Sequence, residues 1–201
     1  MSTAIQSIER LAGIVLAAGG SSRLGQPKQL LQKSGKPQIY NVIKSISRFC
    51  GAGVFVVTGA DAADVEAAIT GCHVRIVRNE NWQRGMASSI VSGLGACMDM
   101  DIDALLIMLC DQPHVSSNDV ARLVESWQNS PSRIAAAAYR ETIGAPAIFP
   151  AVYFDELMKL EGDTGAQQIL LAQSDVNEVE MPSAGFDIDT HADLSLIANQ
   201  P

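Results

Sequence analysis

Short apolar runs alternate with amphipathic stretches along the first 130 residues or so. The apolar runs, rich in Val, Ile and Leu, are residues 11–17, 53–58, 74–77 and 104–109. Runs of this kind are typical of parallel strands that are buried on both faces. The stretches with helical character are residues 37–49, 61–70, 86–98 and 117–128. The alternation predicts an open, mostly parallel sheet with right-handed crossovers.

The pattern changes in the last third of the chain. Its predicted elements are one or two strands in 133–149, helices at 151–160 and 164–173, a strand at 177–181 and a helix from Thr190. Thr190 and Asp193 have the spacing of a capping box at the start of that last helix. Because no linker or repeat interrupts residues 1–201, we predict a single domain, a three-layer α/β/α sandwich of Rossmann-like type.

Composition and charge narrow the class of protein. The chain has 201 residues, 47% of them hydrophobic, and a net charge of −8, which disfavours unspecific binding to nucleic acid. No apolar run approaches the roughly 18 residues that span a bilayer, and no signal peptide is recognisable, so we expect a cytoplasmic protein without a membrane partner. The cysteines form no CxxC pair and are predicted to be reduced core residues: Cys50, Cys72, Cys97 and Cys110. Cys72 and His73 could form half of a metal site, but no second pair matches them.

A glycine-rich loop with two cations follows the first predicted strand. Gly19 and Gly20 let backbone N–H groups turn toward an anion, while Arg23 and Lys28 add positive charge. The loop matches neither the P-loop, GxxxxGK[ST], nor the dinucleotide fingerprint, GxGxxG. It therefore predicts a phosphate-binding loop of another design, and the alternative is a plain turn with solvated charges.

Carboxylates at two positions are candidate metal ligands. Asp111 follows the predicted strand 104–109 directly, where it could hold Mg²⁺ against phosphates, although it could also cap a turn near Pro113. Alternation places Asp187 and Asp189 on one side of an extended segment, where two carboxylates repel unless a cation or solvent separates them. For Asp189 the alternative is a helix N-terminal charge beside Thr190.

A third segment, residues 79–90, joins a predicted strand to a helix. Gly85 permits an unusual backbone there, and Ser88 and Ser89 lie in the first turn of the helix, whose free N–H groups could bind sugar or phosphate oxygens. Ordinary capping by Ser88 is the alternative.

These motifs resemble one family, the nucleotidyltransferases related to molybdenum-cofactor guanylyl- and cytidylyltransferases (MobA-like NTP transferases). The matching segments are LAAGGSSRLG with Lys28, NENWQRGMASS, DQP, GAPAIF, GDTGA and DIDTHAD. They occur in the family's order across nearly the whole chain, and DQP is similar to the cytidylyltransferase branch. Two positions depart from the family: Gln167 stands where Arg is usual, and His191 where Pro is usual.

The resemblance assigns roles to particular residues. It implies that the nucleotide is bound by Leu16, Ala17, Ala18, Gly19, Gly20, Arg23, Lys28, Gly85, Ser88 and Ser89. It also implies that Asp111 and Asp189 hold Mg²⁺ and that Arg23, Lys28 and Asp111 are catalytic. Residues from about 1 to 115 would bind the nucleotide, and those from about 116 to 201 the acceptor.

The resemblance further implies transfer of CMP from CTP to a phosphorylated acceptor, the molybdopterin cofactor, with release of pyrophosphate. CTP is expected over GTP because Ala18 stands where the guanylyltransferase branch has Gly, which leaves less room for a purine. A molybdoenzyme that receives the product is a further expected partner. His114 could contact the acceptor, or could be a loop histidine without a role.

Two alternatives remain open at this point. One is a nucleotidyltransferase with another base or acceptor, such as GTP or a sugar or alcohol phosphate. The other is a non-catalytic protein that delivers the finished cofactor to a molybdoenzyme.

Overall fold

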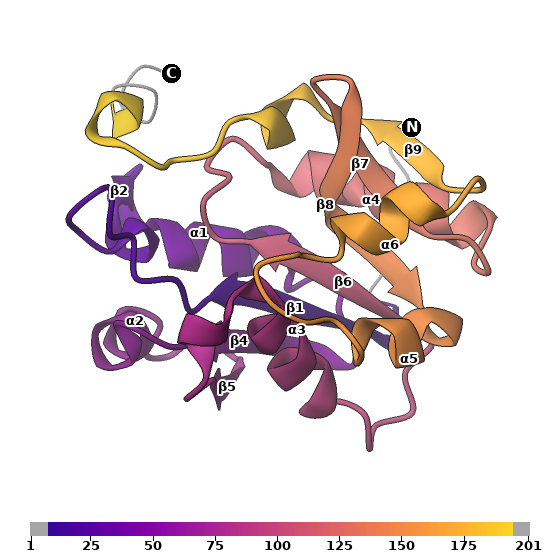
Figure 1. Cartoon of the computed structure of the whole chain (residues 1–201), viewed down its shortest axis with the longest axis horizontal. Coiled ribbons are helices and arrows are strands. Elements are labelled where there is room, and N and C mark those ends of the chain that lie inside the picture. Colours follow the sequence, from indigo (N-terminus) through magenta and orange to yellow (C-terminus); the bar gives the residue numbers. More distant parts are fainter. Residues whose placement is uncertain (1–7, 195–201) are drawn as a thin grey trace.

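A seven-stranded sheet runs through the computed structural model, which describes residues 8–194 (Figure 1). Its strands are β1 (Leu11–Ala17), β4 (Gly53–Thr58), β5 (Arg75–Arg78), β6 (Ala104–Leu109), β7 (Ala135–Tyr139), β8 (Thr142–Pro150) and β9 (Asn177–Glu180). They lie in the order β5-β4-β1-β6-β8-β7-β9, and β8 alone is antiparallel to its neighbours. The prediction of a mostly parallel sheet is confirmed.

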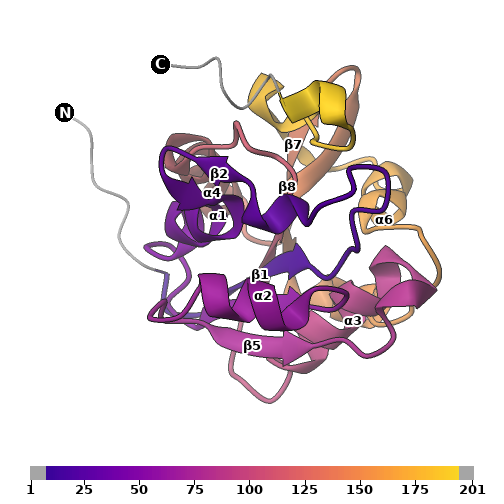
Figure 2. The ribbon, with the colours of Figure 1, turned by 90° about the vertical axis from the view of Figure 1, so that its left-hand side faces the viewer.

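Helices cover both faces of this sheet (Figure 2). One face packs against α1 (Gln38–Ile46), α2 (Ala62–Ala68) and α4 (Ser117–Asn129). The other packs against α3 (Met86–Gly95), α5 (Phe154–Leu157) and α6 (Gln167–Ala172). Two hydrophobic cores result, one on each side of the sheet, and the predicted three-layer sandwich is confirmed.

The central strand β1 explains where a ligand can bind. All seven of its residues are buried, as the continuous apolar run predicted, and it pairs in parallel with β4 on one side and β6 on the other. Leu16 lies opposite Leu109, so the loops that follow β1 and β6 leave the sheet side by side. In sheets of this type, ligands bind in the crevice at such a switch point.

Several observed helices are shorter than the predicted ones, by about one turn, whereas α4 is one residue longer than predicted. Pro37 precedes α1 as its N-cap residue and belongs to the short strand β3 (Lys36–Pro37), which forms a hairpin with β2 (Gln32–Lys33). Sequence patterns missed this hairpin because strands of two residues have no recognisable period, although Ser34 and Gly35 adopt the positive φ angles of a tight turn.

The last helix of the described chain begins at the predicted residue. Thr190 and Asp193 form a capping box at the start of the 3-10 helix His191–Asp193. The remainder of the predicted helix lies outside the described residues. Within residues 8–194, no helix has both the length and the apolar character needed to cross a membrane.

Candidate active site

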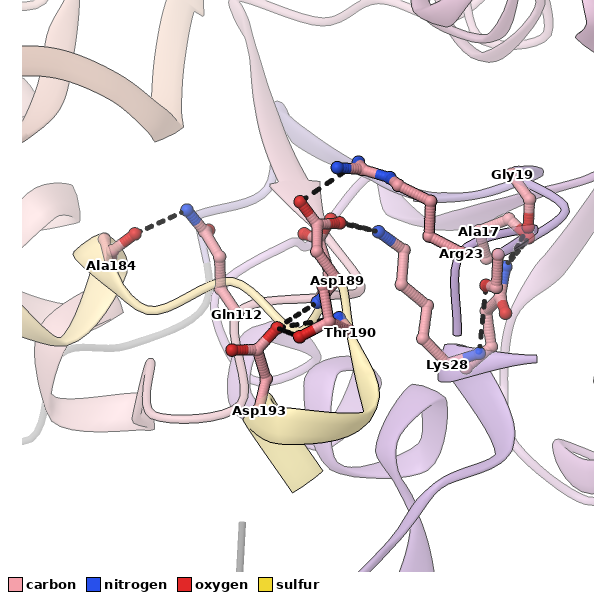
Figure 3. A network of polar contacts seen from close by, with 12 residues as sticks. Ala17, Gly19, Arg23, Lys28, Gln112, Ala184, Asp189, Thr190 and Asp193 are labelled. Atoms are coloured by element: carbon pink, nitrogen blue, oxygen red, sulfur yellow. Dashed lines mark hydrogen bonds and ion pairs between the residues drawn. The ribbon is translucent and has the colours of Figure 1, made fainter. Parts of the chain in front are cut away.

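The glycine-rich loop after β1 is fixed by a glutamine that sequence reasoning missed. Gln29 is buried, and its Nε2 donates hydrogen bonds to the carbonyl oxygens of Ala17 (2.9 Å) and Gly19 (2.8 Å) (Figure 3). The Lys28 backbone N–H donates to Ser21 Oγ at 3.1 Å, which closes the loop from its other end. The 3-10 helix Lys28–Leu30 therefore holds both the loop and the Lys28 side chain in place.

Lys28 contacts both predicted metal ligands, and Arg23 contacts one of them. Lys28 Nζ lies 2.5 Å from Asp111 Oδ2 and 3.6 Å from Asp189 Oδ1. The guanidinium group of Arg23 lies 3.2 Å from the other oxygen of Asp189 (Figure 3). Three segments far apart in the sequence thus place these four side chains within one small volume.

A main-chain hydrogen bond brings the C-terminal segment to this place. The Ile188 N–H donates to the carbonyl oxygen of Asp111 at 3.0 Å, and the Ile188 side chain is buried. Asp193 Oδ2 accepts from the backbone N–H groups of Asp189 (3.0 Å) and Thr190 (2.7 Å). The capping box and the bond to Asp111 together determine the position of Asp189.

The carboxylates crowd the site electrostatically. Desolvation is the largest cause that raises the pKa of Asp187 to about 6, and the nearby charges of Asp111 and Asp189 add to it. Burial by itself lowers the pKa of Lys28, but Asp111 and Asp189 outweigh burial, so that this pKa lies above its ordinary value. The three carboxylates therefore repel one another, and Lys28 offsets part of this repulsion.

A cavity of about 490 Å³ opens between the β1 loop and the start of α3. The predicted site residues that line it are Leu16, Ala18, Gly19, Arg23, Lys28, Gly85, Ser89 and Asp111. Its volume lies in the range of roughly 300–1,000 Å³ that is usual for small-molecule sites. The predicted nucleotide-binding residues therefore largely surround one cavity of suitable size.

Four predicted site residues are not part of this lining: Ala17, Gly20, Ser88 and Asp189. Gly20 packs against Trp82, which lines the cavity. A Cβ added at Gly20 would lie 3.4 Å from the Trp82 ring. The single hydroxyl proton of Ser88 has two acceptors within reach, the carbonyl oxygens of Asn81 and Gly85. Ser88 Oγ also accepts from Asn79, which donates to Ser89 as well. Ser88 thus braces the turn before α3.

Gly85 joins the two halves of the chain. Its φ of +101° suits glycine, and a Cβ there would collide with the carbonyl group of Gly162 and the carboxylate of Asp163. The Ala87 N–H also donates to Gly162 at 3.1 Å. The loop at 161–166 therefore packs directly against the first turn of α3.

Gln112 and His114 occupy the loop after β6. Gln112 is buried, and its Nε2 donates to the carbonyl oxygens of Ala145 (3.0 Å) and Ala184 (2.9 Å), which ties this loop to β8 and to the C-terminal segment. The His114 and Phe186 rings meet edge to face, with their centroids 5.4 Å apart. The buried Nδ1 of His114 has no hydrogen-bond partner.

Three of the four cysteines are buried, as predicted for core residues. Cys50, Cys97 and Cys110 are buried, Cys72 is partly buried, and all four are free thiols. Among residues 8–194, no group of three or more His, Cys, Asp or Glu side chains is arranged to hold a metal ion. A metal at Asp111 and Asp189 would therefore need further oxygen ligands from a substrate or from water.

Comparison with known proteins agrees with the fold. The fold is that of nucleotidyltransferases of the nucleotide-diphospho-sugar transferase type, with structural similarity to Rv0371c from Mycobacterium tuberculosis H37Rv at a TM-score of 0.81. That match has 27% sequence identity and covers 98% of this chain and 100% of the other. Residues 13–176 match the MobA-like NTP transferase domain, and the chain belongs to this family.

Two curated relatives show how the family diverges. The nicotine blue oxidoreductase of Paenarthrobacter nicotinovorans is 32% identical over 193 residues, covering 90% of this chain and 92% of the relative. The probable molybdenum cofactor guanylyltransferase of Rhodopirellula baltica is 25% identical, covering 92% of this chain and 90% of the relative. The family supports a nucleoside triphosphate as substrate and nucleotidyl transfer as the activity.

Proposed function

We propose that this protein transfers CMP from CTP to the terminal phosphate of the molybdopterin cofactor and releases pyrophosphate. The observation that carries the proposal is the meeting of Arg23, Lys28, Asp111 and Asp189 beside a nucleotide-sized cavity. The relative named as a molybdenum cofactor guanylyltransferase supports the acceptor. Residues up to about 115 would bind the nucleotide, and the remainder would bind most of the acceptor.

The reaction requires positioning and charge neutralisation more than covalent chemistry. An oxygen of the acceptor phosphate attacks the α-phosphorus of CTP in line, a new P–O bond forms, and the bond to the β-phosphate oxygen breaks. The acceptor phosphate is already ionised, so no general base is needed. Arg23 and Lys28 stabilise the negative charge that moves onto pyrophosphate. The N–H groups of the β1 loop, held by Gln29, bind the phosphates.

Asp111 and Asp189 fit a divalent cation. Asp111 Oδ1 is buried without a hydrogen-bond partner, and carboxylate oxygens are the ligands that Mg²⁺ prefers. A structure of Rv0371c in complex with manganese supports a divalent metal in this fold. We propose Mg²⁺, held by these two carboxylates and by phosphate oxygens; when bound, it would neutralise charge on the phosphates.

The preference for CTP rests on Ala18. Ala18 is buried, it lines the cavity, and its carbonyl oxygen accepts from the Ala60 N–H at 3.1 Å. A Cβ added at Gly59 would lie 2.8 Å from the Ala18 Cβ, so the backbones at 18 and 59 pack closely. We infer that this close packing leaves room for a pyrimidine and less room for a purine.

One experiment tests the proposal against the alternatives. Purified protein is assayed with CTP, GTP and ATP against molybdopterin, sugar phosphates and alcohol phosphates, with detection of pyrophosphate. We expect pyrophosphate release only from the pair of CTP and molybdopterin. Release with another pair would identify a different nucleotidyltransferase, and cofactor binding without release would indicate a delivery protein.

The oxidoreductase name of the Paenarthrobacter relative gives the assay a second readout. Oxidation of reduced nicotinamide nucleotides is followed in parallel with pyrophosphate. Such oxidation without pyrophosphate release would contradict the proposed function.

A further inference from the structure

A second cavity, of about 230 Å³, lies beside the nucleotide cavity, between α3, β8 and α6. The two cavities share Leu16, Met86, Leu109 and Asp163 as lining residues. Leu109 is the last residue of β6 and precedes Asp111 by two positions. The second cavity therefore meets the first one close to the group of cations and carboxylates.

The second cavity differs from the first in its chemistry. Its walls are mainly the apolar side chains of α3, β6 and β8, including Ile90, Ile107 and Phe149. Of the described residues that line it, none carries a positive charge, and Asp163 carries the one negative charge. An anion in this cavity would lose its hydration without gaining a cation, so the cavity excludes phosphate groups.

Two glycines and a side-chain clamp maintain the shape of this cavity. A Cβ at Gly165 would lie 2.7 Å from Met86 Sδ, and a Cβ at Gly144 would collide with the hydroxyl group of Tyr139. Gln167 Nε2 donates to Thr142 Oγ1 (3.1 Å) and to the Ile143 carbonyl oxygen (2.9 Å), which fixes the start of α6 to β8. The packing that shapes the cavity thus comes from both halves of the chain.

We propose that this cavity binds the pyrimidine end of the acceptor's ring system, a neutral, planar heterocycle with N–H donors on one edge. This inference rests on the proposed function. The volume is below the roughly 300–1,000 Å³ of sites that hold a whole ligand, so it suits one ring system and not the full acceptor. Apolar walls cover the faces of the ring, and Asp163 accepts hydrogen bonds from its N–H edge.

The two cavities thereby recognise opposite ends of one molecule. The ring is held where no cation is present, and the phosphate extends across the shared wall toward Arg23 and Lys28 in the nucleotide cavity. An acceptor bound this way presents its phosphate near Asp111, where the α-phosphate of the nucleotide is expected. The acceptor's orientation follows from the difference in charge between the cavities.

The test is a binding measurement with ring compounds alone, without nucleotide or metal. Pterin carries a 2-amino group, and lumazine carries a carbonyl group at that position. At neutral pH we expect the wild-type protein to bind pterin about tenfold more tightly than lumazine, because hydrogen bonds to a charged group are the stronger ones. Asp163→Asn should abolish that difference. Glu161→Gln, which changes an exposed acid on the same loop, should leave it intact.

A matched pair of substitutions tests the location. Ala166→Phe places a ring in the cavity at the start of α6 and should weaken pterin binding at least about tenfold, as expected for overfilling a packed site. Ala172→Phe adds the same ring at the exposed end of α6 and should leave pterin affinity unchanged. Thermal unfolding of both variants checks that they are folded.

The outcomes separate this inference from the proposed function. Equal binding of pterin and lumazine, no binding of either compound, or pterin binding unaffected by Ala166→Phe would each overturn the ring assignment, even if CTP-dependent pyrophosphate release is observed. Selective pterin binding that is lost in Asp163→Asn and Ala166→Phe would support the assignment, even if the transferred nucleotide proves not to be CMP.

Discussion

Lys28 Nζ and Asp111 Oδ2 lie 2.5 Å apart, so the ammonium group takes a carboxylate oxygen that a metal ion would otherwise use. Lys28 also reaches Asp189 Oδ1, and among residues 8–194 no third acidic side chain is arranged with these two to hold a metal ion. Lys28 and the proposed divalent cation would therefore compete for the same two carboxylates. Triphosphate oxygens would resolve this competition, because they attract the ammonium group and supply further ligands to the metal.

Replacing Lys28 with Ala should strengthen metal binding when no nucleotide is present. We expect the affinity for Mn²⁺ alone to rise by about tenfold, or about 1.4 kcal/mol, because the competing cation is gone. Titration followed by electron paramagnetic resonance measures free Mn²⁺ directly. Lys44→Ala, which removes an exposed lysine of α1, is the matched control and should leave the affinity unchanged. Weaker Mn²⁺ binding in Lys28→Ala would contradict the competition.

The same substitution should have the opposite effect on turnover. Without Lys28 the charge on the leaving pyrophosphate is less well stabilised, and loss of one such contact commonly costs about 2–4 kcal/mol of barrier. Single-turnover kinetics at saturating metal and CTP give this value. A collapse of thermal stability in place of the rate loss would show that Lys28 is structural.

Asp111→Asn and Asp189→Asn should each lower turnover by about 10²–10³-fold and leave the fold intact. The amide keeps the volume of each side chain and removes the charge that the metal requires. Pyrophosphate release and thermal unfolding are measured on the same samples, with Asp99→Asn at an exposed position as control. Activity within a few-fold of wild type in either variant would remove that residue from the metal site.

Gln29→Met should loosen the phosphate-binding loop. Methionine has a similar length but cannot donate to Ala17 and Gly19, whose carbonyl groups would each lose a partner at a cost of about 1–3 kcal/mol. We expect CTP affinity, measured by calorimetry, to fall about tenfold or more. Gln32→Met, at an exposed hairpin position, should bind CTP like wild type, and equal affinity in both variants would argue against a role for Gln29.

Ala18→Gly should relax base selection without reversing it. Removal of the methyl group gives a purine more room but adds no hydrogen-bond partner for the guanine edge, so GTP use should rise modestly while CTP use is retained. Competition kinetics with both nucleotides present measure the ratio. If wild type already prefers GTP, or if the ratio is unchanged, base selection lies elsewhere, and Met86 to Ser89 become the next candidates.

Asp119 predicts a pH dependence of stability. Burial raises its pKa, but hydrogen bonds from Ser116, Arg122 and Ser183 outweigh burial, so this pKa lies below its ordinary value. A lowered pKa stabilises the fold above the unfolded value of about 3.9 and ceases to do so as pH falls through the folded value. Asp119→Ala should therefore cost about 1 kcal/mol at neutral pH and progressively less in acid.

Denaturant unfolding at several pH values measures this cost. Glu125→Ala, which alters an exposed acid on the same helix, is the control and should show no comparable pH dependence. A constant difference between Asp119→Ala and wild type from neutral to acid pH would be evidence against the proposed origin of the stabilisation.

The central strands and the loops that follow them could be predicted from the sequence because each has a recognisable local residue pattern. Residues 11–17, 53–58 and 104–109 match β1, β4 and β6 residue for residue, since strands buried on both faces read as continuous apolar runs. Placement of the loop after β1 beside Asp111 then followed from parallel topology alone.

Other features depend on contacts between distant residues and leave no such signal. No local sequence pattern distinguishes Gln29 from an ordinary surface glutamine, because its role depends on hydrogen bonds to two carbonyl groups at Ala17 and Gly19. The hydrogen bond from Ile188 to Asp111 links positions 77 residues apart in the numbering, and the direction of β8 is set by its pairing with β6. The second cavity likewise arises from packing between α3, β8 and α6.

The bond between Ile188 and Asp111 also has a consequence for the growing chain. A nascent polypeptide that has emerged only as far as β9 already contains Arg23, Lys28 and Asp111, but it lacks Asp189. Segments near the N-terminus generally fold first during synthesis. In this protein the ribosome must synthesise almost all of the described sequence before Asp111 and Asp189 can come together. A partly made chain can therefore form the phosphate-binding loop but lacks one of the two carboxylates of the proposed metal site.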